Sequence, residues 1–147
     1  MLRHTDDPII IKESFRISVN KLWNALTEVD QMRQWFFENI PDFKPEVGFQ
    51  TQFAVVNEGR TFTHLWTITE VVPDKKIVYN WKYKEYPGDS LAIFELSQEN
   101  DQTLLRLTLK ILEDFPAEIP EFSRESCIGG WNYFLGERLK EYLPDKS

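Results

Sequence analysis

One histidine lies among apolar residues in the middle of the sequence. His64 shares its parity with Phe62 and Trp66 in a stretch where apolar residues alternate with threonines, so all three are predicted to face the interior of the fold. A histidine there can act as a general acid or base, or bind a ligand by a hydrogen bond. The simpler interpretation, which we favour, is a histidine hydrogen-bonded to a neighbouring hydroxyl or carbonyl group.

Two glutamates could work with such a histidine. Glu13 and Glu70 share parity with apolar neighbours, and a carboxyl group that truly faces an interior has its pKa raised by burial. A Glu–His pair across a pocket, such as Glu13 with His64, would be a candidate for proton transfer; Tyr83 is an alternative partner. The other interpretation places each glutamate near a strand end in water, and for Glu70 we favour it.

The remaining reactive groups give little chemistry. Cys127, near the start of a predicted helix, is the single cysteine, so an intramolecular disulfide and a multi-cysteine zinc site are excluded. We interpret it as a small buried hydrophobe. No histidine–carboxylate set has metal-ligand spacing, and Gly129-Gly130 is not a phosphate-binding loop. We therefore expect no metal, no cofactor and no catalytic residue.

Aromatic residues give the strongest indication of function. The chain has 11 Phe, 5 Trp and 5 Tyr, and many of them fall on the inward parity of predicted strands. If a gap remains between sheet and helix, these rings line a pocket for an apolar or amphipathic molecule; alternatively, the rings fill the space and leave no cavity. The predicted lining residues are Trp35, Phe53, Phe62, His64, Trp66, Tyr79, Trp81, Tyr83, Phe94, Leu107, Trp131 and Leu135.

The hydrophobic periodicity changes along the chain and defines the elements that position these rings. Residues 9–18 alternate as a strand, residues 19–35 have helical spacing in two short pieces, and residues 47–109 read as five further antiparallel strands. A long helix is predicted over residues 123–143. Ser18 or Asn20 is expected to cap the first helix and Thr27 the second. This order predicts an α+β fold, with a curved antiparallel sheet and helices on one face.

Four stretches in this order resemble a known superfamily. They are residues 19–36, residues 66–81, the pair 92–96 with 103–107, and Gly130-Trp131 followed by Leu135 and Leu139. Together they resemble the START-like (Bet v 1-like, SRPBCC) superfamily, and more narrowly the homologues of the activator of the heat-shock-protein-90 ATPase. The resemblance implies the helix-grip fold, in which an antiparallel sheet wraps around a long C-terminal helix with a cavity between them.

Charge and length limit the remaining functions. The 147 residues include 17 Lys and Arg against 24 Asp and Glu, a net charge of -7, which argues against a nucleic-acid partner. No run of residues reaches the ~20 apolar positions of a membrane span, and no signal peptide is recognised, so we expect a cytoplasmic protein. Residues 9–143 are predicted to form a single START-like domain, with a disordered N-terminus (1–8) and a C-terminal tail (144–147).

Three functions remain open. The first is a non-catalytic module that binds a lipid-like or aromatic small molecule between sheet and helix. The second is a protein-interaction domain of co-chaperone type, with a chaperone as partner. The third is a cyclase- or hydrolase-like enzyme that uses His64 with Glu13 or Tyr83 in the same cavity. We expect the first.

Overall fold

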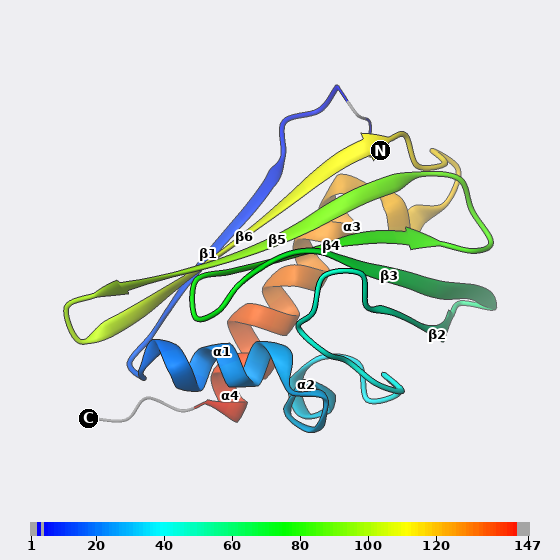
Figure 1. Cartoon of the computed structure of the whole chain (residues 1–147). Coiled ribbons are helices and arrows are strands. Elements are labelled where there is room, and N and C mark those ends of the chain that lie inside the picture. The colour runs from blue at the N-terminus through cyan, green and yellow to red at the C-terminus, as the bar shows by residue number, and fades with distance from the viewer. Residues whose placement is uncertain (1–2, 4, 144–147) are drawn as a thin grey trace.

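The alternating stretches form six antiparallel strands, which a computed structural model describing residues 3 and 5–143 arranges in one curved sheet (Figure 1). The strand order is β1-β6-β5-β4-β3-β2, so every strand after the first pairs with its neighbour in sequence and β1 closes against β6. The strands are β1 (Ile9–Phe15), β2 (Gln50–Asn57), β3 (Arg60–Val72), β4 (Lys76–Tyr83), β5 (Asp89–Glu99) and β6 (Gln102–Glu113).

Two short helices connect β1 to β2. The helix α1 (Val19–Thr27) begins at Ser18, whose hydroxyl accepts a hydrogen bond from the Lys21 amide, as one of the two predicted caps. The helix α2 (Val29–Trp35) follows after one residue. The prediction that Thr27 caps α2 was wrong: Thr27 is the last residue of α1, and its hydroxyl donates to the Trp23 carbonyl one turn earlier.

The predicted C-terminal helix is confirmed, with an irregularity in its middle. It consists of α3 (Arg124–Trp131), a π-helical segment (Asn132–Arg138) and α4 (Leu139–Tyr142), after a short 3-10 turn at Pro120–Phe122. Stretches of π-helix are rare and widen the helix locally. Within this one the helix passes close to β1, because a Cβ atom at Gly136 would lie 3.2 Å from Oε2 of Glu13.

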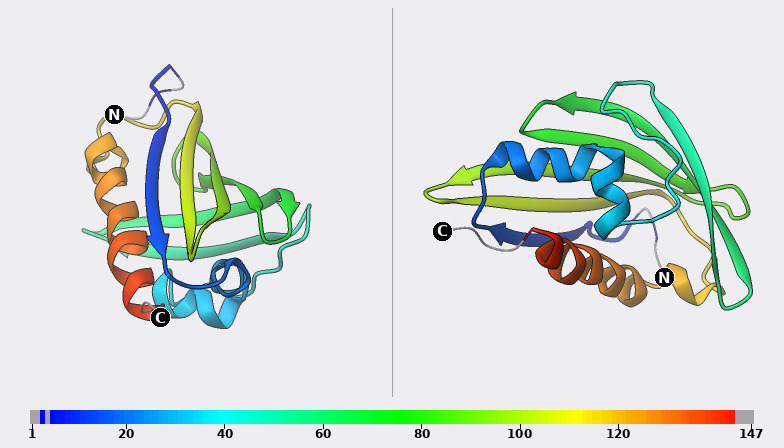
Figure 2. Two further views of the ribbon diagram at one scale, coloured as in Figure 1. Left: turned by 90° about the vertical axis from the view of Figure 1, so that its left-hand side faces the viewer. Right: turned by 90° about the horizontal axis from the view of Figure 1, so that it is seen from below.

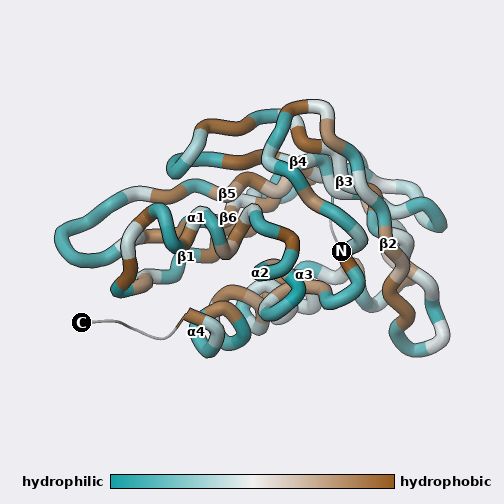
Figure 3. Tube along the Cα trace, turned by 60° about the horizontal axis from the view of Figure 1, so that its bottom comes forward, coloured by the Kyte–Doolittle hydropathy of each residue, from teal (hydrophilic) through white to brown (hydrophobic). Residues whose placement is uncertain are grey.

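The hydrophobic core lies between the concave face of the sheet and the helices. Seen from below, α1, α2 and the C-terminal helix all lie on this one side (Figure 2), and hydrophobic positions alternate with hydrophilic ones along the strands (Figure 3). Phe15, Leu105, Leu107 and Leu135 are fully buried there. The arrangement is the helix-grip fold expected from the sequence.

The chain ends fall largely outside this description. The predicted tail, residues 144–147, lies outside the described residues, as do residues 1, 2 and 4 of the predicted disordered N-terminus. Within the described part, the side chain of Arg124 donates to the Asp7 and Pro8 carbonyls, so the start of β1 is held against α3.

Candidate functional site

The sheet and the C-terminal helix bring the predicted lining residues together. All of them except Tyr83 are buried, and all belong to the core or pack against it. Trp66, Trp81 and Trp131 illustrate the arrangement: the Trp81 ring centroid lies 5.0 Å from that of Trp66 on the neighbouring strand and 5.3 Å from that of Trp131 on the helix. The strands and the helix therefore enclose a continuous cluster of rings.

His64 is held neutral within this cluster. Its Nδ1 lies 3.0 Å from the Phe62 carbonyl oxygen, and because a carbonyl can only accept, Nδ1 carries the proton. The ring stacks on Phe53 with centroids 4.8 Å apart. Burial lowers the pKa of His64 to about 4, against smaller opposing effects of the Phe62 carbonyl and the Glu85 charge. At pH 7 the ring is uncharged, and Nε2 is left as a hydrogen-bond acceptor.

The structure does not bring either glutamate to His64. Glu13 lies on β1, which three strands separate from β3, and its Oε1 is 3.8 Å from Nζ of Lys140 on the C-terminal helix. Glu70 is exposed because a β-bulge between Ile68 and Glu70 shifts its register, and its Oε2 lies 3.4 Å from Nζ of Lys76. Tyr83 is nearer, with its ring centroid 4.9 Å from that of His64.

Trp66 holds an unpaired polar atom at the centre of the cluster. Its side chain is 1% exposed, and its Nε1 has no hydrogen-bond partner. Two other tryptophans show the usual arrangement, since Nε1 of Trp35 donates to the Ala25 carbonyl and Nε1 of Trp81 to the Tyr83 hydroxyl. A buried donor left without a partner costs about 1–3 kcal/mol, so the Trp66 N–H calls for an explanation.

Two phenylalanines that were not predicted to line the site lie at its middle. Phe36 and Phe37 follow directly after α2, and both insert their rings between sheet and helix. Phe36 contacts Trp66, Trp81 and Trp131, with centroids 5.6, 6.1 and 5.8 Å away. A usable signal was present in the sequence, namely three consecutive rings, Trp35-Phe36-Phe37, at the end of a helix.

Phe37 separates this interior from a groove on the surface. Its ring lies 4.9 Å from His64, 5.1 Å from Phe53 and 5.0 Å from Phe134, centroid to centroid. Outside it lies a groove of about 490 Å³ between the α2–β2 connection, the edge strand β2 and the C-terminal helix. The groove is lined by Phe36, Phe37, Glu38, Asn39, Ala54, Val55, Val56, Phe134 and Arg138.

A small cavity lies on the inner side of the cluster. It measures about 50 Å³, far below the roughly 300–1,000 Å³ typical of small-molecule pockets. Its lining residues are Trp81, Tyr83, Ser90, Leu109, Phe115, Phe122, Cys127 and Trp131. Rings therefore fill most of the space between sheet and helix, which is the second of the two possibilities that the aromatic pattern left open.

The polar groups around this inner cavity are unreactive at neutral pH. Burial raises the pKa of the Cys127 thiol to about 11, and its Sγ lies 3.7 Å from the Glu121 carbonyl oxygen. Burial also raises the pKa of Tyr83. Ser90 uses its hydroxyl proton in a hydrogen bond to the Trp81 carbonyl. Both the thiol and the phenol are thus protonated at neutral pH.

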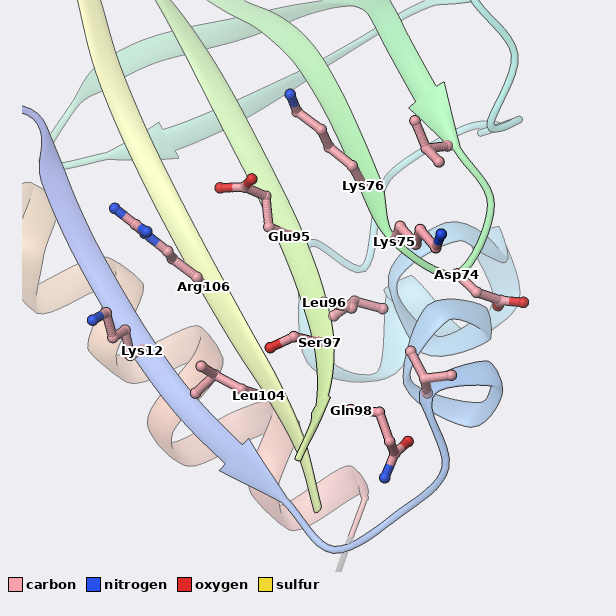
Figure 4. Close-up of a pocket in the computed structure, with 12 residues that line it drawn as sticks. Lys12, Asp74, Lys75, Lys76, Glu95, Leu96, Ser97, Gln98, Leu104 and Arg106 are labelled. Carbon is pink, nitrogen blue, oxygen red and sulfur yellow. The ribbon is translucent and has the colours of Figure 1, made fainter. Parts of the chain in front are cut away.

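A larger hollow, of about 770 Å³, lies on the opposite face of the sheet (Figure 4). Lys12, Arg106, Glu95 and Lys76 stand in register across β1, β6, β5 and β4 and line it with mixed charges. None of the predicted lining residues takes part in it.

Two further kinds of feature are absent from residues 3 and 5–143. This part of the chain contains no group of three or more His, Cys, Asp or Glu side chains placed to hold a metal ion. It also contains no helix with the length and apolar character needed to span a bilayer.

The curved sheet, the long helix and the ring-filled interior define a helix-grip domain. The chain belongs to the family described as "Activator of Hsp90 ATPase homolog 1-like protein", whose profile matches residues 16–144. No curated protein is similar enough in sequence to count as a match.

Solved structures support the fold. The protein Mll3558 from Rhizobium loti superposes with a TM-score of 0.79 at 20% identity, over 92% of this chain and 96% of that one. The Aha1 dimer from Colwellia psychrerythraea gives 0.70 at 20% identity, over 95% and 98%. DynU16, described as a putative protein in the dynemicin biosynthetic locus, gives 0.74 at 21% identity over 94% of this chain. This chain spans only 47% of DynU16.

Proposed function

We propose that this protein binds a small apolar or amphipathic molecule between the sheet and the C-terminal helix. The observation that carries the proposal is the position of Phe36 and Phe37. Their rings come from a connection between α2 and β2, and they occupy the space between the surface groove and the inner cavity. When the partly buried Phe37 ring moves aside, the groove opens onto the ring cluster, with Phe36 remaining as part of its wall.

The exchange of a phenylalanine ring for a ligand ring is energetically feasible. Fully burying a phenylalanine side chain is worth about 1.5–3 kcal/mol, and Phe37 is only partly buried. A ligand ring that takes its place recovers contacts with the same neighbours, among them Phe53, His64 and Phe134. The loop conformation thus changes at modest cost, and the aromatic shell determines which molecules bind.

Removing the Phe37 ring by mutation tests the proposal directly. We expect Phe37→Ala to bind naphthalene about tenfold or more tightly than the wild type, because the truncation opens the groove onto the ring cluster. Phe49→Ala is the matched control, since Phe49 is also partly buried but lines neither the groove nor the cavity. Binding is measured by quenching of tryptophan fluorescence and by native mass spectrometry. If naphthalene binds saturably to none of the three proteins, namely the wild type and the two variants, the proposal is refuted.

Binding rather than catalysis is favoured by the surroundings of His64. The hydrogen bond of its ring within the described residues is to the Phe62 carbonyl, and Glu13 pairs with Lys140. The Tyr83 hydroxyl accepts a hydrogen bond from Nε1 of Trp81 instead. A general acid or base needs a partner within hydrogen-bond reach or one water away. We therefore propose no catalytic role for His64.

A second candidate function is binding to a heat-shock-protein-90 chaperone, which family membership favours. The experiment is a pull-down of a purified heat-shock-protein-90 homologue by the immobilised protein, followed by measurement of its ATPase rate. Retention with a changed ATPase rate would support a co-chaperone role. No retention at micromolar concentrations would remove it, without bearing on small-molecule binding.

A further inference from the structure

Two residues on β3, Trp66 and His64, each carry a ring nitrogen without a hydrogen bond to the described residues, and their ring centroids lie 6.4 Å apart. One is the Nε1–H donor of Trp66, which has no hydrogen-bond partner. The other is Nε2 of His64, which is the acceptor nitrogen because Nδ1 holds the proton against the Phe62 carbonyl. The two residues are two positions apart on one strand, so both side chains project from the concave face.

The same rings cover both atoms. Phe37 lies 4.9 Å from His64 and 6.2 Å from Trp66, and Phe53 lies 4.8 and 4.9 Å from them, between ring centroids. Trp66 is 1% exposed and His64 is 5% exposed. The Trp66 donor is therefore sealed among apolar rings, the His64 ring is nearly buried beside it, and Phe37 lies between both residues and the surface groove.

This combination is unfavourable for folding alone. Replacing Trp66 by a purely apolar ring would remove the unpaired donor, since a buried polar group without a partner destabilises the folded state. Groups of this kind occur where a bound molecule supplies the missing partner. A molecule that accepts one hydrogen bond and donates another matches the Trp66 donor and the His64 acceptor.

We infer that Trp66 and His64 form a recognition site for the hydroxyl group of an aromatic ligand, a phenol in the broad sense. The inference rests on the proposed function, because the ligand ring takes the place of Phe37. A single phenolic oxygen accepts the hydrogen bond from Nε1 of Trp66 and donates its proton to Nε2 of His64. The ring then lies against Phe53 and Phe134, which contact Phe37 in the unliganded protein.

The pair sets a preference that can be measured. Two hydrogen bonds formed inside an apolar enclosure correspond to roughly 10- to 100-fold in affinity. We therefore expect 2-naphthol to bind 10- to 100-fold more tightly than naphthalene, in both the wild type and Phe37→Ala. The hydrocarbon occupies the same space but leaves both polar atoms unpaired.

The test compares the two probes in protein labelled with ¹⁵N. The chain has five tryptophans, and we expect 2-naphthol to move the Trp66 indole N–H resonance downfield, whereas naphthalene leaves it near its unliganded position. Trp66→Phe keeps a ring at this site without the donor, so it should reduce the preference for 2-naphthol by about three- to tenfold, the share of one hydrogen bond. Trp23→Phe is the control, because Trp23 is buried in α1 away from the groove and the cavity and should preserve the preference.

The outcomes separate this inference from the proposed function. Equal affinity for the two probes, or a Trp66 resonance that does not respond to 2-naphthol, overturns the hydroxyl-recognition site and leaves small-molecule binding intact. Failure of both probes to bind Phe37→Ala overturns the proposed function and the inference together. If Trp23→Phe also loses the preference for 2-naphthol over naphthalene, the loss reflects a general destabilisation of the fold, and the inference is overturned.

Discussion

Acidification is expected to destabilise this protein through the buried side chain of His64. Burial holds the pKa of His64 at about 4 in the folded state, whereas in the unfolded chain it returns to about 6.5. Between these values the unfolded chain binds more protons than the folded one, so the free energy of unfolding falls as the pH falls. The contribution of His64 to the free energy of unfolding is fully present above pH 6.5, is lost between pH 6.5 and pH 4, and changes no further below pH 4.

The size of this effect follows from the two pKa values. The difference is about 2.5 units, and each unit corresponds to about 1.4 kcal/mol. Between pH 7 and pH 4.5, the wild type is expected to lose about 2–3 kcal/mol of its free energy of unfolding through this histidine. That is a large share of the roughly 5–15 kcal/mol typical of a folded domain.

Urea unfolding at a series of pH values measures this loss. The reference protein is His64→Gln, whose side chain is polar but does not titrate. Carboxylates whose pKa values are lowered, such as Glu85 and Glu121 through their hydrogen bonds to Thr63 and Arg60, contribute equally to both proteins. The difference between the two curves therefore isolates His64. Parallel curves from pH 7 to pH 4.5 would refute the buried, neutral histidine.

Three other predictions concern the enclosure of the site. Leu135→Ala should lower the free energy of unfolding by about 2–5 kcal/mol, because Leu135 is fully buried; an effect below 1 kcal/mol in urea unfolding would contradict the packing of helix on sheet. Cys127 should react with a disulfide reagent at pH 7.5 at least about a hundredfold more slowly in the folded than in the urea-unfolded protein, since burial raises its pKa to about 11, and equal rates would show an accessible thiol. Gly88→Ala should lower the free energy of unfolding by about 2–3 kcal/mol, because Gly88 has φ +118° and a Cβ there would collide with the Phe115 ring. Gly59 has φ +76° but open space around it, so Gly59→Ala should lower the free energy of unfolding by only about 1–2 kcal/mol. Thermal unfolding of both variants measures the difference, and equal losses would contradict the collision with Phe115.

The fold could be predicted because each element has its own period in the sequence. Alternation along residues 60–68 and 76–83 placed Phe62, Trp66 and Trp81 on the buried face, and the structure places them there. The helical spacing likewise put Trp131 and Leu135 on the face that packs on the sheet. Such patterns depend on local geometry, which one sequence is enough to show.

The site was only partly predictable, because its details depend on breaks in that geometry. Glu70 shares the parity of its apolar neighbours, yet the bulge after Ile68 turns it outward. Phe37 lies beyond the last periodic residue of α2, so no period assigns it a face. The volume left between sheet and helix is a small difference between large packed volumes. Parity therefore identified the rings but not the amount of space between them.

The structure of the complex with 2-naphthol tests the central claim most directly, through isotope-filtered NOEs between the bound probe and the protein. The account predicts contacts from the naphthol ring to Phe53, Trp66 and Phe134, with loss of the contact between Phe37 and His64. Contacts confined to the outer hollow of the sheet, for example to Leu104 and Ser97 (Figure 4), with the Phe37 ring still packed against His64, would contradict it.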